Sequence, residues 1–209
     1  ALIPRVTLDP AVVLSDISAA LSASFTGSGV ESSGFKWAED ALLTSPQSGI
    51  GTGATSPIAD TLTVLNPGKV YYFTAYAVKG GEYFYGDTLP LLTLPGITTV
   101  AADDLTGVSA TLNATFSADS ITGQGFVWGR QLDLSDGTSV SADTTEGSTV
   151  IEYALTGLTE DSTHYFSAYA MNASGTSYGD TLSFVPHVPP TMTITAAEVS
   201  DGESSSHAS

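Results

Sequence analysis

The sequence predicts an all-β protein with two tandem antiparallel β-sandwiches, followed by one extra C-terminal strand. The first observation is an internal repeat, because three motifs recur in the same order in the second half of the chain. The second is the alternation of apolar and polar residues that half-buried strands show, and the third is a turn signal about every 8 to 12 residues. The repeated pairs are Gly34-Phe35-Lys36-Trp37 with Gly125-Phe126-Val127-Trp128, Tyr72-Phe73-Thr74-Ala75-Tyr76-Ala77 with Tyr165-Phe166-Ser167-Ala168-Tyr169-Ala170, and Tyr85-Gly86-Asp87-Thr88-Leu89 with Tyr178-Gly179-Asp180-Thr181-Leu182.

The strands can be placed in chain order within each copy. The first strands are expected near residues 6–8 and 97–100, each soon after a proline. Strict alternation then predicts strands at 21–25 and 112–116, with Leu, Ala and Phe on the buried face. In the segment 71–77, alternation puts Tyr71, Phe73, Ala75 and Ala77 on one face and Tyr72, Thr74 and Tyr76 on the other. The glycine-rich run at 48–53 is expected to be a flexible loop that differs between the copies.

These elements divide the chain into three parts. We place the first sandwich at residues 1–95, the second at 96–188, and a C-terminal strand with a polar tail at 189–209. The segment Pro190-Thr191-Met192-Thr193-Ile194-Thr195 resembles the start of a third copy. It is either the beginning of a truncated repeat or a lone strand, and an unpaired apolar strand seeks a partner sheet.

Composition limits the classes of partner. Five basic residues against 22 acidic ones give a formal net charge of −17, which disfavours nucleic acid and anionic membrane surfaces. Cysteine is absent, so the chain can form neither a disulfide nor a thiolate metal site. No stretch approaches the ~20 apolar residues of a membrane span. The abundance of Thr, Ser, Gly and Ala with little Lys is typical of an exported protein, and we expect an extracellular or cell-surface location.

One run of residues resembles a known family. The segment Leu65-Asn66-Pro67-Gly68-Lys69-Val70-Tyr71 is similar to the run that sets the tyrosine corner in fibronectin type III domains. Together with the repeated motifs, it resembles the fibronectin-III-like repeats of bacterial surface and secreted proteins. The resemblance implies an Ig-like sandwich in each copy and leaves the function open. The second copy departs from it with Glu160 in place of Pro67 and His164 in place of Tyr71. If the corner survives there, an imidazole must supply its hydrogen bond, and we therefore expect the second sandwich to be less stable.

Candidate catalytic and cofactor motifs are weak. Ser177 lies in a Gly-x-Ser-x-Gly pattern, but the pattern falls in a predicted β-hairpin rather than a strand–turn–helix, so we interpret it as a turn. The turn at Asp133-Leu134-Ser135-Asp136-Gly137 lacks the full spacing of a calcium loop. No cofactor is therefore expected, and calcium stays an alternative at this turn. Zinc is not expected, because the histidines are widely spaced.

Aromatic and asparagine residues supply further candidates. Trp37 and Trp128 are interpreted as core anchors, because each follows a Phe on the same face. The outward tyrosines of the repeated motif offer faces for glycans or a neighbouring subunit, although ordinary sheet packing is favoured. Asn113 and Asn172 fit the N-glycosylation sequon, and we expect Asn113 to face outward and Asn172 to lie in a turn.

The first functional hypothesis is a non-catalytic, exported structural subunit of a surface filament or appendage. A strand of one subunit would complete an open sheet edge in the next, so that copies assemble head to tail. The expected assembly-strand residues are Thr191, Met192, Thr193, Ile194, Thr195 and Val199. The alternatives are a spacer or adhesion module of a larger secreted protein, such as a glycan-degrading one, and a viral capsid decoration protein. The expected partner is the protein itself or another surface protein, and a small-molecule ligand is not expected.

Overall fold

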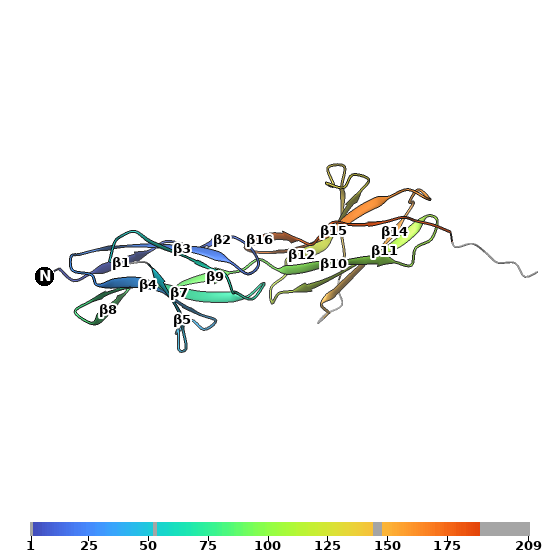
Figure 1. Ribbon diagram of the computed structural model, residues 1–209. Helices are drawn as coiled ribbons and strands as arrows, with labels where there is room; N and C mark the ends of the chain where they lie inside the picture. Colours follow the sequence, from blue (N-terminus) through green and yellow to red (C-terminus); the bar gives the residue numbers. More distant parts are fainter. Residues whose placement is uncertain (1, 52–53, 144–147, 189–209) are drawn as a thin grey trace, which may run out of the picture.

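The structure, a computed structural model, describes residues 2–51, 54–143 and 148–188, and all of its regular elements are strands (Figure 1). The predicted all-β fold is confirmed. The strands of the first half are β1 (Arg5–Leu8), β2 (Val12–Val13), β3 (Ala19–Thr26), β4 (Ser32–Ala38), β5 (Gln47–Gly51), β6 (Ile58–Leu62), β7 (Val70–Lys79), β8 (Glu82–Tyr85) and β9 (Leu89–Leu92). Those of the second half are β10 (Gly96–Asp103), β11 (Ser109–Ser117), β12 (Gly123–Gly129), β13 (Thr138–Ser141), β14 (Val150–Thr156), β15 (His164–Asn172), β16 (Gly175–Tyr178) and β17 (Leu182–Phe184).

Each half is a sandwich of two antiparallel sheets. In the first sandwich, β3 pairs with β1, β2 and β6, while the facing sheet has the order β5-β4-β7-β8, with β9 also paired to β7. The second sandwich repeats this plan as β10-β11-β14 against β13-β12-β15-β16, with β17 paired to β15. Repeated motifs therefore occupy equivalent strands, and β4 and β7 correspond to β12 and β15.

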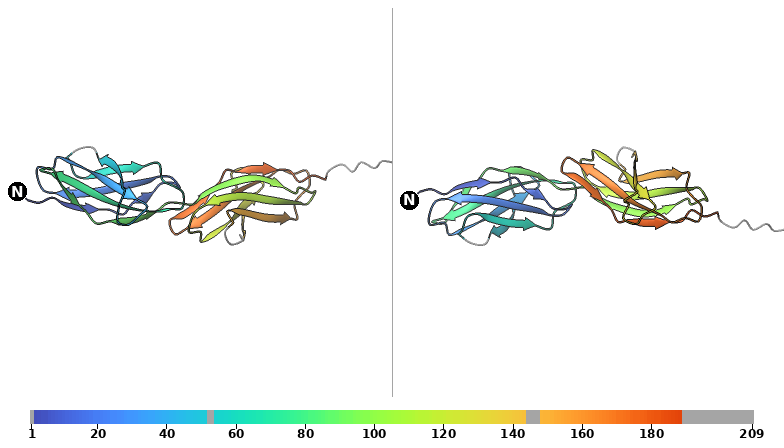
Figure 2. Two further views of the ribbon diagram at one scale, coloured as in Figure 1. Left: turned by 90° about the horizontal axis from the view of Figure 1, so that it is seen from below. Right: turned by 90° about the horizontal axis from the view of Figure 1, so that it is seen from above.

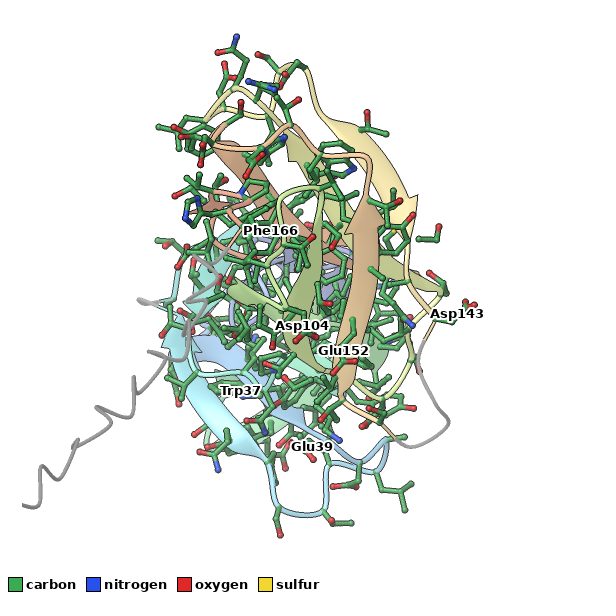
Figure 3. All side chains as sticks on the ribbon, turned by 90° about the vertical axis from the view of Figure 1, so that its right-hand side faces the viewer. Trp37, Glu39, Asp104, Asp143, Glu152 and Phe166 are labelled. Carbon is green, nitrogen blue, oxygen red and sulfur yellow. The ribbon has the colours of Figure 1, made fainter. Side chains whose placement is uncertain are left out.

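The apolar faces predicted from alternation form the core of each sandwich. Phe35 and Phe73, on the neighbouring strands β4 and β7 of one sheet, are fully buried in the first sandwich, and Phe126 and Phe166 take their places in the second. Burying a ring of this size contributes about 2–3 kcal/mol relative to leaving it in water. The two tryptophans lie against these cores and keep part of their surface exposed, as expected of core anchors. Figure 3 looks along the molecule and shows Phe166 inside its sandwich, with acidic side chains such as Glu152 spread over the outside.

One expectation about the strands was wrong. Residues 48–51, predicted as part of a flexible loop, belong to the edge strand β5 and pair with β4, including Gly49 opposite Phe35. The run lacks alternating side chains because glycines occupy it, so its strand character comes from pairing with β4 rather than from its own pattern. The rest of that run, residues 52–53, lies outside the described residues.

The two sandwiches lie end to end in an elongated molecule (Figures 1 and 2). The N-terminal strand β1 lies in the first sandwich. The chain after β17 leaves the second sandwich at the end that points away from the first. The described part of the chain contains no helix that is long and apolar enough to cross a membrane. In this arrangement the two sandwiches contact each other at their ends.

Candidate functional site: the junction between the sandwiches

The junction is built from two segments on each side. The first sandwich supplies the turn at residues 66–69 and the linker at 92–96, which joins β9 to β10. The second sandwich supplies the loop after β11 and the turn between β15 and β16. These segments are connected by hydrogen bonds, close packing and one ion pair.

Two hydrogen bonds, one of them buried, fix the linker against the second sandwich. The Nδ2 of Asn172 donates to the carbonyl oxygen of Thr93 at 2.8 Å, and the Oγ of Ser174 donates to that of Leu92 at 2.6 Å. Both Asn172 and Thr93 are buried. Loss of such a bond leaves a buried carbonyl without its partner, which costs about 1–3 kcal/mol. The asparagine therefore holds the two sandwiches in one relative position.

Thr93 also ties the linker to its own sandwich. Its Oγ1 donates to the carbonyl oxygen of Asn66 at 2.8 Å and accepts from the backbone N–H of Lys69 at 3.0 Å. The buried side chain of Thr93 thus connects the turn at 66–69 to the linker. Its backbone carbonyl accepts the hydrogen bond from Asn172. The linker behaves as part of the fold rather than as a flexible tether.

Close packing fixes the other side of the junction. Gly68 has a φ of 63°, and a Cβ placed there would lie 2.2 Å from the Cβ of Ala118. The backbone N–H of Asp119 donates to the carbonyl oxygen of Gly68 at 3.3 Å. The Nζ of Lys69 forms an ion pair with the carboxylate of Asp119, and this hydrogen bond raises the pKa of Lys69 above its usual value. Because the pair is exposed to solvent, it contributes little to stability.

The junction changes the interpretation of one predicted sequon. Asn172 is the last residue of β15 rather than a turn residue, and its amide is buried against the linker, so it does not offer a free glycosylation site. Asn113 lies in β11 and is half-buried, with Nδ2 donating to the carbonyl oxygen of Ala101 at 3.2 Å. Sequence reasoning missed the role of Asn172 because a domain junction has no local pattern.

The tyrosine corner exists in the first sandwich and is replaced in the second. The hydroxyl of Tyr71 accepts from the backbone N–H of Asn66 at 2.8 Å, as the resemblance implies. His164 is buried, and its Nδ1 lies 2.8 Å from the carbonyl oxygen of Ser162. The ring nitrogen therefore donates to a carbonyl two residues upstream, whereas the corner oxygen accepts an N–H five residues upstream. The imidazole thus bonds the upstream backbone in a different way from the tyrosine hydroxyl, and its ring also stacks against Phe184 with centroids 5.4 Å apart.

The carboxylates of the predicted calcium turn bind the backbone of their own loop. Asp136 accepts from the backbone N–H groups of Arg130, at 2.9 Å, and of Gln131, at 3.1 Å. Asp133 accepts from the backbone N–H of Ser135 at 3.0 Å. This is the role of aspartates that stabilise a turn. Calcium binding here stays a prediction.

Three other side chains come together at the far end of the second sandwich. Glu160, Asp161 and His187 place ligand atoms within 4.8 Å of one another, and His187 pairs with Asp161 at 3.0 Å. Such a set is able to hold a metal ion, but all three are exposed. Sequence spacing did not suggest it, because His187 is distant from the other two in the chain.

The remaining sequence candidates fall in ordinary positions or outside the described chain. Ser177 lies in β16, where it pairs with Ala170, so the Gly-x-Ser-x-Gly pattern belongs to a hairpin as predicted. The expected assembly strand, Thr191 to Val199, lies outside the described residues.

The chain has weak similarity to known proteins. No protein-family model matches the chain. The receptor-type tyrosine-protein phosphatase eta of Gallus gallus is 25% identical over 143 residues, covering 67% of this chain and 10% of that protein. The chain thus spans a small part of this relative.

Among solved structures, the chicken CNTN1 FN1–FN3 domains align with a TM-score of 0.37 and 10% identity, covering 87% of this chain and 66% of that one. The curated relative is a chicken protein, so the match gives no support to the bacterial part of the resemblance. The fold of both sandwiches is fibronectin-type-III-like.

Proposed function

We propose that the chain is a non-catalytic extracellular spacer, in which the junction holds two fibronectin-III-like sandwiches end to end at a fixed angle. The observation that carries this proposal is the buried bond from Asn172 to the linker carbonyl of Thr93. Most domain pairs move relative to each other unless their interface is large or tightly bonded. A spacer needs the opposite property, because it must keep its two ends apart.

Small-angle X-ray scattering of a matched glycine pair tests the proposal. Gly68 and Gly80 both have left-handed backbones, with φ of 63° and 62°, but only a Cβ at Gly68 would meet a neighbour. Gly68→Ala is expected to force the sandwiches apart and broaden the distribution of their separation. Gly80→Ala carries the same backbone penalty and is expected to leave the scattering profile unchanged. A wild-type profile that requires freely moving sandwiches contradicts the proposal.

We further propose that such spacers assemble into filaments by strand addition, in which a strand of one copy pairs with a sheet edge of the next. Its support is an open groove of about 560 Å³ between residues 3–8 and 84–87, where the edge strands β1 and β8 run without a ladder between them in the described chain. Edges of this kind accept an added strand. Deletion of residues 190–209 is expected to leave monomers, and filaments that persist without this segment rule the mechanism out. A module of a larger secreted protein and a capsid decoration protein remain the alternative settings for the same spacer.

A further inference from the structure

A lysine surrounded by tyrosines lies on the outer face of the first sandwich. The Nζ of Lys36 on β4 donates to the hydroxyl of Tyr85 on β8 at 2.7 Å. It also lies 5.0 Å from the ring centroids of Tyr83 and Tyr85 and 5.8 Å from that of Tyr76. The rings of Tyr83 and Tyr85 are nearly parallel, 5.9 Å apart, and both are about half exposed. We name these four residues the lysine–tyrosine cluster.

A hollow adjoins the lysine–tyrosine cluster. It has a volume of about 250 Å³ and lies between the sheet and the loop that follows β4. Leu42 of this loop is 85% exposed and offers an apolar surface at the edge of the hollow. The hollow thus combines apolar walls with an ammonium group and hydroxyls, the mixture found in sites for small ligands. Its lining includes Lys36, Leu42, Leu43, Pro46, Tyr85 and Thr88.

The second sandwich lacks this arrangement although its strands are equivalent. Val127 stands at the position of Lys36, and Thr176 stands at the position of Tyr83. The equivalent loop packs down on the sheet, since a Cβ at Gly137 would lie 2.6 Å from the side chain of Val127. A feature required by the fold would recur in both copies, so the cluster and its hollow have a reason specific to the first sandwich.

The charge of Lys36 and the net charge of the chain limit which ligands the hollow favours. Among the described residues, no carboxylate lies within ion-pair distance of Lys36, in a chain with 22 acidic residues. The tyrosine rings stabilise the ammonium, and its hydrogen bond to the Tyr85 hydroxyl raises the pKa of Lys36, so the group stays charged at neutral pH. The net charge of −17 repels an anionic ligand as it approaches. The site therefore favours a neutral ligand rich in hydroxyl groups.

We propose that the lysine–tyrosine cluster and its hollow bind one unit of a neutral saccharide. The weakly positive C–H groups of a sugar ring would pack on the negative faces of Tyr83 and Tyr85. Its hydroxyls would accept from the Nζ of Lys36 and exchange hydrogen bonds with Thr88 at the rim. This gives the chain an adhesive activity that goes beyond its role as a spacer.

NMR titration of the full chain tests the proposal. The probes are cellohexaose, xylohexaose and chitohexaose, each up to about 10 mM, a concentration that detects even millimolar affinity. At least one is expected to shift the backbone amides of residues 36, 42–45 and 83–88, while the equivalent amides at 127, 133–136 and 176–181 stay in place. No shift with any of the three overturns the proposal, as do equal shifts in both sandwiches.

Variants that copy the second sandwich identify the responsible groups. Lys36→Val and Tyr83→Thr are each expected to weaken binding at least about tenfold, which corresponds to about 1.4 kcal/mol. Tyr178→Ala in the second sandwich is the matched control and should leave the affinity unchanged. Unfolding curves of the same samples separate lost binding from lost folding. Unchanged affinity in both folded variants, or tighter binding of hexagalacturonate than of the neutral probes, also overturns the proposal.

Discussion

Tyr71 and His164 occupy equivalent positions in the two sandwiches, but they form hydrogen bonds with different backbone groups. The hydroxyl of Tyr71 fixes the N–H of Asn66, which lies in the turn that contacts the second sandwich. The imidazole of His164 fixes the carbonyl of Ser162 and lies between Trp128 and Phe184. One side chain therefore positions a turn, whereas the other mainly fills an aromatic core.

This difference predicts that replacement by Phe lowers the unfolding free energy of the two sandwiches unequally. Tyr71→Phe leaves the half-buried N–H of Asn66 without its acceptor, so the first sandwich should lose about 1–3 kcal/mol of unfolding free energy. His164→Phe leaves the Ser162 carbonyl without its donor but keeps an aromatic ring stacked on Phe184, so the second sandwich should lose less than the first. Denaturation followed through Trp37 or Trp128 alone, with the other replaced by Phe, reports each sandwich separately. In the parent chain the second sandwich is expected to unfold first, and the reverse order contradicts the prediction from the missing corner.

At the scale of elements, the loop between β12 and β13 depends on one carboxylate. Backbone hydrogen bonds from Arg130, and then from Gln131, lower the pKa of Asp136 below its usual value. A carboxyl whose pKa is depressed by folding stabilises the fold above its unfolded pKa of about 3.9, and this contribution disappears as the pH falls through the folded pKa. The loop therefore has an acid-sensitive attachment to the sheet.

Asp136→Asn tests this attachment. The difference in unfolding free energy between the parent chain and the variant should be constant above about pH 5 and shrink as the pH falls below about 4. Denaturation curves of the second sandwich, read through Trp128, measure it. The transition of the first sandwich is the internal control and should not respond. A difference that stays constant down to pH 2 means that the carboxylate does not hold the loop.

Elements with their own side-chain pattern were predictable, and elements defined by their neighbours were not. Alternation placed the core face of β7 correctly at Tyr71, Phe73, Ala75 and Ala77, but Thr74 and Tyr76, expected on the outward face, are buried as well. Strand β5 was missed, since glycines give it no apolar face. The partners of Lys36 were also missed, because they follow from the pairing of β7 with β8 rather than from local sequence. The repeat did indicate where to look, since that cluster differs between the copies.

At the scale of the whole molecule, the shape depends on a few contacts of unequal strength. The buried bond between Asn172 and Thr93 is shielded from solvent, and the contact of Gly68 with Ala118 is steric. Neither depends on ionic strength. The ion pair between Lys69 and Asp119 is exposed, so salt screens it within a Debye length of about 3 Å at 1 M. The geometry therefore implies that charge has little part in keeping the two sandwiches in line.

The last prediction follows from this ranking. The scattering profile of the parent chain should be the same at about 0.05 M and 1 M NaCl, because only the exposed pair is screened. Asn172→Ala should broaden the distribution of separations at both salt concentrations, since it leaves the Thr93 carbonyl without its buried donor. Lys69→Met is the matched control and should behave like the parent chain. If high salt or Lys69→Met loosens the molecule as much as Asn172→Ala does, electrostatic attraction rather than the buried amide holds the sandwiches end to end.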